Sequence, residues 1–320
     1  MTDQKLHDQK LHAALQTFGY TKAIKDGSLH PNGFVFDFEE VPAIIQAFRR
    51  MVRGLEFDMT EMAITTYMCA KQFGKPFTAL PVFVMRAFHH GAIVMNKNSG
   101  ITHPKQLEGK KVGVNRGYTV TAGVWARSIL QHEYGVDLSK IEWVLSGDEH
   151  VEEFRAPSYV TPTKSDKSFE EMLLSGELAA ASGVVSTHPD IVTLIPDATK
   201  TGYEALRTRG HYPINHTVVV KDSLLAANPN LAKDLFQMFC EAKRPYVEAL
   251  KAGTLANPTK VDETFGKVMA ITGKDPLPYG IEPNRQALES IMQYAREQQC
   301  VTKPLTLEEL FAKGTHDLVG

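Results

Sequence analysis

The chain is poor in cysteine: only Cys69, Cys240 and Cys300 occur among its 320 residues. These three are far apart and include no CxxC pair, so the sequence indicates neither a disulfide framework nor a zinc site. No excess of one charge is present either, because 35 basic and 37 acidic residues are interspersed and give a formal net charge of -2. The sequence therefore lacks the electrostatic signature of a protein that binds nucleic acid or an anionic membrane.

Long apolar runs are also missing. Nothing approaches the 18 or more apolar residues that a membrane-spanning helix needs. The N-terminal residues MTDQKLHDQKLHAALQ lack the apolar core of a signal peptide and a lipoprotein-type cysteine. We therefore expect a cytoplasmic protein with no membrane partner. The same N-terminus repeats DQKLH directly, which we interpret as a terminal extension without function.

Several catalytic motifs are absent. The sequence contains no GxGxxG or Walker pattern, which argues against a nucleotide phosphate as ligand. It contains no GxSxG elbow that would indicate a serine nucleophile. His89, His90, His188 and His216 show no HExxH or comparable spacing, so we expect no metal site.

The composition that remains is that of an ordinary globular protein, with 43% hydrophobic and 22% charged residues. At roughly 100–200 residues per domain, the length favours two domains. Short β-rich runs alternate with amphipathic helical stretches, which predicts an α/β fold with mainly parallel sheets. The expected strands are 11–16, 34–38, 57–64, 77–84, 91–95, 111–114, 141–145, 179–185 and 216–220, and the expected helices are 42–54, 65–73, 120–135 and 168–175, followed by a largely helical region from 228 onward.

The order of these elements predicts two lobes. An α/β start, a self-contained α/β middle and a long helical return are typical of one lobe interrupted by another. We place residues 1–93 and 221–320 in the first lobe and residues 94–220 in the second, with a cleft between them. The polar residues 146–168 show no clear period and are the best candidate for a mobile loop.

The turn NRGYTVT, residues 115–121, joins a predicted strand to a predicted helix. Its free backbone N–H groups and the positive helix end favour an anion, and Arg116 adds a forked donor that suits a carboxylate. Tyr118, Thr119 and Thr121 complete the candidate binding residues of this turn. The alternative is a plain capped helix with a surface arginine.

The run Arg86-Ala-Phe-His89-His90 places one guanidinium and two imidazoles at the end of a strand. In an extended segment the two histidines point to opposite faces, so only one of them can face a cleft. Histidine titrates near neutral pH and can act as a general acid or base. The alternative at each position is a structural or surface histidine, although the neighbouring arginine favours function.

Other polar residues lie near the predicted cleft. Asn215 and His216 stand in HYPINHTVV at the returning strand, and Glu61 lies in the otherwise apolar segment FDMTEMAITTY. Open α/β sheets bind ligands at the carboxyl ends of their strands. Helix capping by Thr65 or Thr66, and a histidine satisfied by backbone carbonyls, are the structural alternatives.

Five segments together resemble the 4,5-dihydroxyphthalate decarboxylase family: FDMTEMAITTYM, LPVFVMRAFHHGAIVMN, LEGKKVGVNRGYTVTAGVWARSILQHEYGV, YPINHTVVV and PYGIEPNRQALE. The ordered match covers most of residues 20–295. The resemblance implies a fold similar to the type 2 periplasmic binding proteins, in agreement with the two-lobed layout. It also implies an enzyme that converts 4,5-dihydroxyphthalate to protocatechuate and carbon dioxide without an organic cofactor.

This implied reaction assigns roles to the candidate residues. A site must hold the carboxylate that stays, deprotonate or polarise a phenol, and deliver one proton. The candidates for binding carboxylates are Arg86, Arg116, Tyr118 and Thr119, and those for proton transfer are His89, His90 and His216. Base rates for soluble cytosolic enzymes further favour a homo-oligomer.

Three places depart from the pattern expected of the family. Residues 18–22 read FGYTK where a motif resembling Asp-Tyr-Asp-Arg is expected, His89 replaces an arginine, and Asn215 replaces a hydrophobic residue. A related aromatic or heteroaromatic acid therefore stays open as the substrate. Two other classes stay open as well. One is a solute-binding protein for a small aromatic carboxylate, which would need export; the other is an enzyme resembling the thiamine-pyrimidine synthases, which share this fold and use histidine with iron.

Overall fold

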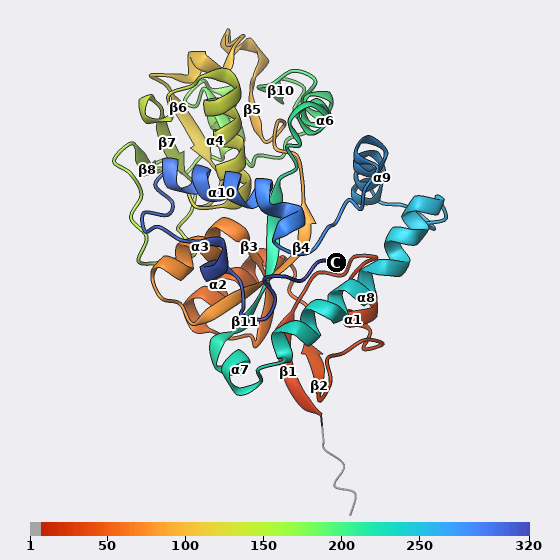
Figure 1. The fold of residues 1–320 in the computed structure, drawn as a ribbon. Coiled ribbons are helices and arrows are strands. Elements are labelled where there is room, and N and C mark those ends of the chain that lie inside the picture. Colours follow the sequence, from red (N-terminus) through yellow and green to blue (C-terminus); the bar gives the residue numbers. More distant parts are fainter. Residues whose placement is uncertain (1–7) are drawn as a thin grey trace, which may run out of the picture.

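A first sheet forms the lower half of the molecule as drawn in Figure 1, a computed structural model that describes residues 8–320. Its strands, in spatial order, are β2 (Phe34–Phe38), β1 (Gln9–Ala14), β3 (Met59–Ala63), β11 (Ile214–Lys221) and β4 (Phe77–Arg86). The first copy of the DQKLH repeat lies outside the described residues. Residues 9–12 of the second copy form the first part of β1, with Leu11 fully buried, so this copy is part of the first sheet and not the terminal extension that we expected. β4 contains Pro81 and lies at the sheet edge, where the missing N–H of a proline disrupts least.

A second sheet forms the upper half. Its strands, in spatial order, are β10 (Ile191–Thr193), β5 (Ile93–Asn96), β9 (Ala180–Ser182), β6 (Lys111–Val114), β7 (Glu142–Leu145) and β8 (Val160–Pro162). β6 is parallel to β7 and β9, and β7 is parallel to β8. β5 is antiparallel to both of its neighbours, β9 and β10.

Both sheets are therefore mixed, whereas the sequence pattern predicted mainly parallel ones. In the first sheet β1 is parallel to β2 and β3, but β11 is antiparallel to β3 and β4. β5 and β11 are the strands that follow when the chain passes from one sheet to the other. A strand that arrives from the other half needs no crossover helix on its new sheet, so nothing forces it to run parallel. The predicted α/β class is confirmed.

Helices cover the faces of both sheets. Their bounds are α1 (Lys22–Lys25), α2 (Ile44–Gly54), α3 (Ile64–Gln72), α4 (Thr121–Tyr134), α5 (Phe169–Leu174), α6 (Ala198–Arg209), α7 (Asp222–Ala227), α8 (Leu231–Ala252), α9 (Lys260–Thr272), α10 (Arg285–Glu297) and α11 (Leu307–Leu310). Four short 3-10 helices lie at Lys97–Ser99, Pro104–Leu107, Leu138–Lys140 and Glu282–Asn284. Within residues 8–320, no helix is long and apolar enough to cross a membrane.

The two halves share one continuous apolar core. This core includes Phe48 and Phe83 of the first half together with Val112 and Trp143 of the second. α10 packs against α3 of the first half and against α4 of the second, and Figure 1 shows it lying between the sheets. The two halves are therefore joined through buried apolar side chains.

The division into lobes at residues 93 and 220 stays a prediction. All of β11 pairs within the first sheet, which favours placing residues 214–220 with the first lobe.

The segment predicted as a mobile loop contains β8 and forms ion pairs with the first half. Arg49 and Arg53 of α2 each place Nη2 against the Asp148 carboxylate, at 2.7 and 2.9 Å, and Lys75 Nζ lies 2.7 Å from Glu153 Oε1. The polar character of the segment therefore reflects partners on the opposite half.

Candidate active site

Glu61 and His216 form the centre of the candidate site. Antiparallel pairing of β3 with β11 sets His216 opposite Ala63, two positions from Glu61 on the same face. His216 Nδ1 lies 2.6 Å from Glu61 Oε1, and the imidazole side chain is 15% exposed whereas the carboxylate is fully buried. An ionised carboxylate only accepts hydrogen bonds, so Nδ1 carries the proton. The other ring nitrogen, Nε2, is then left for a substrate.

Neighbouring groups hold this dyad in place. The backbone N–H of Gln16, just after β1, donates to Glu61 Oε2 at 3.1 Å. The ring of Phe48 on α2 packs edge-on against His216, with ring centroids 5.0 Å apart. Phe48 also contacts the ring of His150, at 6.4 Å, which belongs to the second half. The dyad is therefore fixed from both sides of the boundary between the sheets.

The segment Arg86–His90 does not act as one cluster, because its side chains have separate partners. His89 Nε2 lies 3.1 Å from Asn215 Oδ1, and burial lowers the pKa of His89 to about 4, so its imidazole is neutral at pH 7. His90 is also buried, and its Nε2 lies 3.2 Å from Glu133 Oε2 on α4. The structure thus brings His89 to Asn215 and leaves His90 in a pair of its own.

Arg86 is buried at the end of β4, and most of its donors are in use. Its Nη1 donates to Asn284 Oδ1 at 2.6 Å and its Nη2 to the Tyr212 carbonyl at 2.5 Å. Its guanidinium also lies 4.1 Å from the centroid of the Tyr212 ring. Burial lowers the pKa of Arg86 to about 10, which leaves it charged at neutral pH. The buried Nε has no partner among residues 8–320, and the residue lines the cavity described below.

At the turn before α4, a carboxylate of the protein itself occupies the predicted anion position. Glu149 accepts hydrogen bonds from the backbone N–H groups of Tyr118 and Thr119, and from the Thr119 hydroxyl at 2.6 Å. Thr121 Oγ1 accepts from the Thr65 N–H at the start of α3, at 3.1 Å. This turn therefore binds a carboxylate, as its chemistry predicts, and the N–H groups of Tyr118 and Thr119 are already bonded to it.

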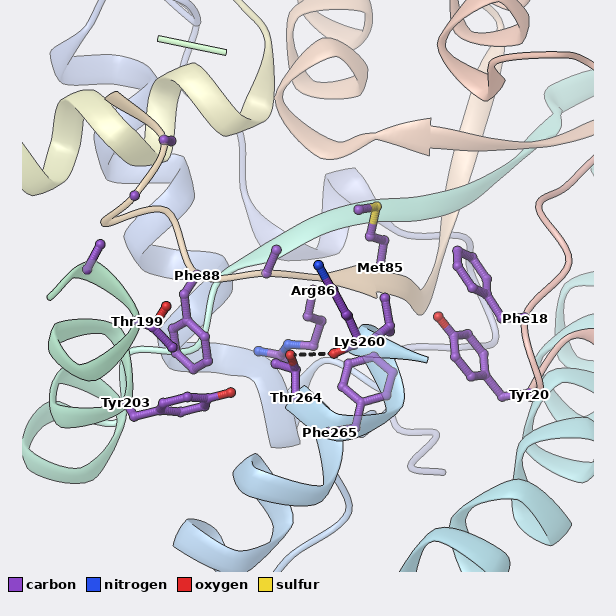
Figure 2. A pocket seen from close by; sticks show the side chains of 15 residues that line it. Phe18, Tyr20, Met85, Arg86, Phe88, Thr199, Tyr203, Lys260, Thr264 and Phe265 are labelled. Atoms are coloured by element: carbon purple, nitrogen blue, oxygen red, sulfur yellow. Dashed lines mark hydrogen bonds between the residues drawn. The ribbon is translucent and has the colours of Figure 1, made fainter. Parts of the chain in front are cut away.

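A cavity of about 500 Å³ opens beside Arg86 (Figure 2). Its walls come from β4, from the start of α6 in the second half, and from the start of α9. They contain five aromatic rings and two cations: Phe18, Tyr20, Phe88, Tyr203 and Phe265, with Arg86 and Lys260. No acidic residue of the described chain lines it. Aromatic walls with net positive charge suit an aromatic carboxylate.

The cavity adjoins the dyad. Met85, which lines the cavity, pairs directly with His216 in the first sheet. A smaller cavity of about 140 Å³, lined by Asn115 and by the exposed Arg116, shares Ala92 with the larger one. The dyad, the aromatic cavity and Arg116 therefore lie along one boundary between the two sheets.

The sequence patterns did not single out several residues around this site. These are Phe48, Glu133, Glu149, His150, Tyr203, Lys260 and Phe265. Most of them lie on ordinary amphipathic helices or in the irregular segment after β7, so no local signal distinguishes them. Only the polar, aperiodic character of residues 146–168 pointed to part of this set.

The described residues contain no group of three or more His, Cys, Asp or Glu side chains placed to hold a metal ion. Cys69, Cys240 and Cys300 are free thiols. Burial raises the pKa of both Cys69 and Cys300 to about 12, which keeps these two thiols protonated and unreactive.

Comparison with known proteins supports the resemblance seen in the sequence. No family model matches the chain. It is 26% identical to 4,5-dihydroxyphthalate decarboxylase of Comamonas testosteroni, over 94% of this chain and 96% of that protein. It is 29% identical to the enzyme of the same name from Pseudomonas putida, over 62% of this chain and 83% of that protein. The chain is therefore similar to two proteins named 4,5-dihydroxyphthalate decarboxylase. This similarity supports a decarboxylase function for it.

Solved structures confirm the predicted fold. The chain matches the periplasmic aliphatic sulphonate binding protein SsuA of Escherichia coli with a TM-score of 0.54 and 14% identity, over 96% of this chain and 93% of that one. It matches the desulfurization enzyme DSZB in complex with biphenyl-2-sulfinic acid with a TM-score of 0.53 and 14% identity, over 96% and 97% of the two chains. At this identity the likeness establishes the periplasmic-binding-protein-like fold and nothing about ligands.

Proposed function

We propose that this protein catalyses the non-oxidative decarboxylation of a hydroxylated aromatic dicarboxylate, with 4,5-dihydroxyphthalate as substrate and protocatechuate and carbon dioxide as products. The observation that carries the proposal is the Glu61–His216 dyad beside a cavity lined by aromatic rings and two cations. The names of the two decarboxylase relatives point to the same reaction.

The reaction requires one proton and breaks one carbon–carbon bond. The hydroxyl para to the departing carboxylate gives up or shares its proton and pushes electrons into the ring. The ring carbon that carries the carboxylate then takes a proton from an acid. The bond to the carboxylate breaks, its electron pair returns to the ring, and carbon dioxide leaves. One proton thus replaces carbon dioxide, and no outside oxidant or reductant is needed.

The hydroxyl and the protonated carbon lie at opposite ends of the ring, so two protein groups are required. His216 suits the acid, because the buried carboxylate of Glu61 stabilises the imidazolium that must deliver the proton. His89 with Asn215 is the candidate at the phenol end, where a neutral imidazole polarises a hydroxyl by hydrogen bonding. His90 is held by Glu133, which favours a structural role for it.

Positive charge holds the substrate carboxylates. Arg86 lines the aromatic cavity, and Arg116 is exposed at the smaller cavity. Thr119 and Thr121 act indirectly in this proposal, because their hydroxyls are bonded to Glu149 and to Thr65, and the backbone N–H of Tyr118 is also bonded to Glu149. Exclusion of water from the boundary between the sheets would disfavour the charged carboxylate. It would therefore favour its loss as neutral carbon dioxide.

Incubation with 4,5-dihydroxyphthalate, with and without a chelator, tests the proposal. We expect equal amounts of carbon dioxide and protocatechuate in both samples. Tight binding of this compound without turnover would contradict the decarboxylase function. It would favour the alternative that the protein is a solute-binding protein. Turnover that the chelator abolishes would point to a metal-dependent reaction and would contradict the metal-independent mechanism proposed here.

A further inference from the structure

The cavity beside Arg86 contains a second cation whose charge is not used within the protein. Lys260 is the first residue of α9 and lines the cavity. Figure 2 draws its side chain among those that line the cavity, and the residue is exposed to solvent. In the part of the chain that the structure describes, neither an ion pair nor a hydrogen bond involves Lys260 Nζ. Arg86, by contrast, donates to Asn284 and to the Tyr212 carbonyl.

The acidic residues near Lys260 in sequence do not explain its position. Asp262 accepts hydrogen bonds from the Tyr246 hydroxyl, at 2.5 Å, and from the backbone N–H and hydroxyl of Thr259, each at 2.7 Å. A cation in the first turn also opposes the helix dipole, which favours negative charge there. Lys260 therefore stabilises neither α9 nor a neighbouring carboxylate.

α9 is anchored where Lys260 enters the cavity. The capping box between Thr259 and Asp262 fixes the first turn, and Phe265 of the same helix is buried. Val268 packs with Leu206 and Tyr212 next to Phe88, so α9 contacts the second half of the molecule. The backbone at Lys260 is thus positioned while its long side chain stays free to meet a ligand.

We propose that Lys260 binds the carboxylate that the substrate retains, and that it makes the cavity select aromatic dicarboxylates over monocarboxylates. The inference rests on the proposed function and names its specificity residue. One carboxylate meets the Arg86 guanidinium, and the second pairs with Lys260 while the ring lies among the aromatic walls. A monocarboxylate satisfies only one of these two cations.

Binding of phthalate and of benzoate measured by calorimetry tests this, because neither compound carries the hydroxyl that drives decarboxylation. The wild-type protein should bind phthalate more tightly than benzoate. Lys260→Gln should weaken phthalate binding by at least about tenfold, the order expected for one charge-assisted pair, and should change benzoate binding by less than about threefold. Lys260→Arg should restore the preference. Lys251→Gln, an exposed lysine at the end of α8, is the matched control and should behave as the wild type.

Three outcomes would overturn the inference. Lys260→Gln could weaken the binding of both ligands equally, it could leave phthalate binding unchanged, or the wild-type protein could bind neither acid. The readout does not depend on turnover. A protein with the expected preference that fails to release carbon dioxide from 4,5-dihydroxyphthalate would contradict the proposed function alone. If the wild-type protein is active and the Lys260→Gln variant keeps the preference for phthalate over benzoate, only the role of Lys260 is contradicted.

Discussion

A histidine held by a buried carboxylate differs from a free histidine in two respects that bear on catalysis. Its tautomer is fixed, because Nδ1 donates to Glu61 and Nε2 is left free. Its charged form is also stabilised, because the carboxylate lies 2.6 Å away with no exposure to solvent. His89 is the opposite case: burial disfavours its charge and Asn215 offers only a neutral partner. The two residues are therefore suited to different steps.

Replacement of His216 by Ala should lower kcat for decarboxylation by about a hundredfold to ten-thousandfold, the usual contribution of a general acid or base. Circular dichroism should show an unchanged fold, because the imidazole is partly exposed and is not enclosed in the apolar core. His132→Ala is the control: this histidine pairs with Glu297 at the surface, and the variant should keep its activity. An active His216→Ala variant would remove His216 from the mechanism.

Replacement of Glu61 by Gln should lower kcat and change the pH profile. The amide keeps the shape of the side chain but no longer stabilises an imidazolium. His216 delivers the proton as an imidazolium in this mechanism, so the basic limb of the plot of kcat/KM against pH should move to lower pH, which a merely structural role of Glu61 would not cause. A reduced kcat with an unchanged pH profile would contradict the proposed role of Glu61 in stabilising the imidazolium of His216.

At the scale of whole elements, the segment after β7 connects the two halves. Asp148 and Glu153 pair with side chains of the first half, and Glu149 supplies the carboxylate at the start of α4. These acids differ in environment. The Glu149 carboxylate accepts three hydrogen bonds in a half-buried position, whereas Glu152 is 65% exposed and pairs only with Arg53.

Glu149→Ala should therefore destabilise the protein more than Glu152→Ala. Loss of the Glu149 carboxylate leaves the N–H groups of Tyr118 and Thr119 without their partner, which costs about 1–3 kcal/mol in the free energy of unfolding. Loss of an exposed ion pair costs less than about 1 kcal/mol. Urea unfolding of both variants measures the difference. Equal free energies would show that Glu149 contributes no more than a surface charge.

At the scale of the whole molecule, burial of neutral histidines couples folding to pH. His89, His150 and His211 each have a pKa lowered to about 4, in each case mainly by burial. In the unfolded chain histidine has a pKa near 6.5, so between these values the unfolded state binds more protons. The stability contributed by neutral burial is therefore fully present above about pH 6.5 and is lost as the pH falls toward 4.

Urea unfolding between pH 7.5 and 5 should show this directly. The free energy of unfolding should decrease as the pH falls, and His89 alone accounts for up to about 3 kcal/mol over its whole range. His150→Asn should make the dependence on pH shallower, because it removes one of the three groups. A free energy that is constant or increases on acidification would contradict burial of these histidines in neutral form.

Much of the architecture follows from local sequence. The strand and helix periods predicted most elements to within a few residues, since hydrophobic spacing decides which faces are buried. The predicted strand 179–185 proved shorter because Gly183, at φ 72°, turns the chain after Ser182. The patterns missed α1, α6, α7, β8 and β10. They also missed the antiparallel strand directions, because pairing between distant segments sets these and local spacing does not.

The sequence by itself determined the α/β class, the relationship to the decarboxylases, and the presence of Glu61 and His216 in polar positions on two strands. Only the tertiary structure joined these two side chains, because the register of strands 155 residues apart decides which pairs meet. It also filled the turn before α4 with Glu149 and brought Lys260 of α9 to a cavity bounded by β4 and α6. The sequence states which residue occupies each position, whereas long-range packing decides which partner its side chain contacts. That partner determines the charge state and the role of the side chain.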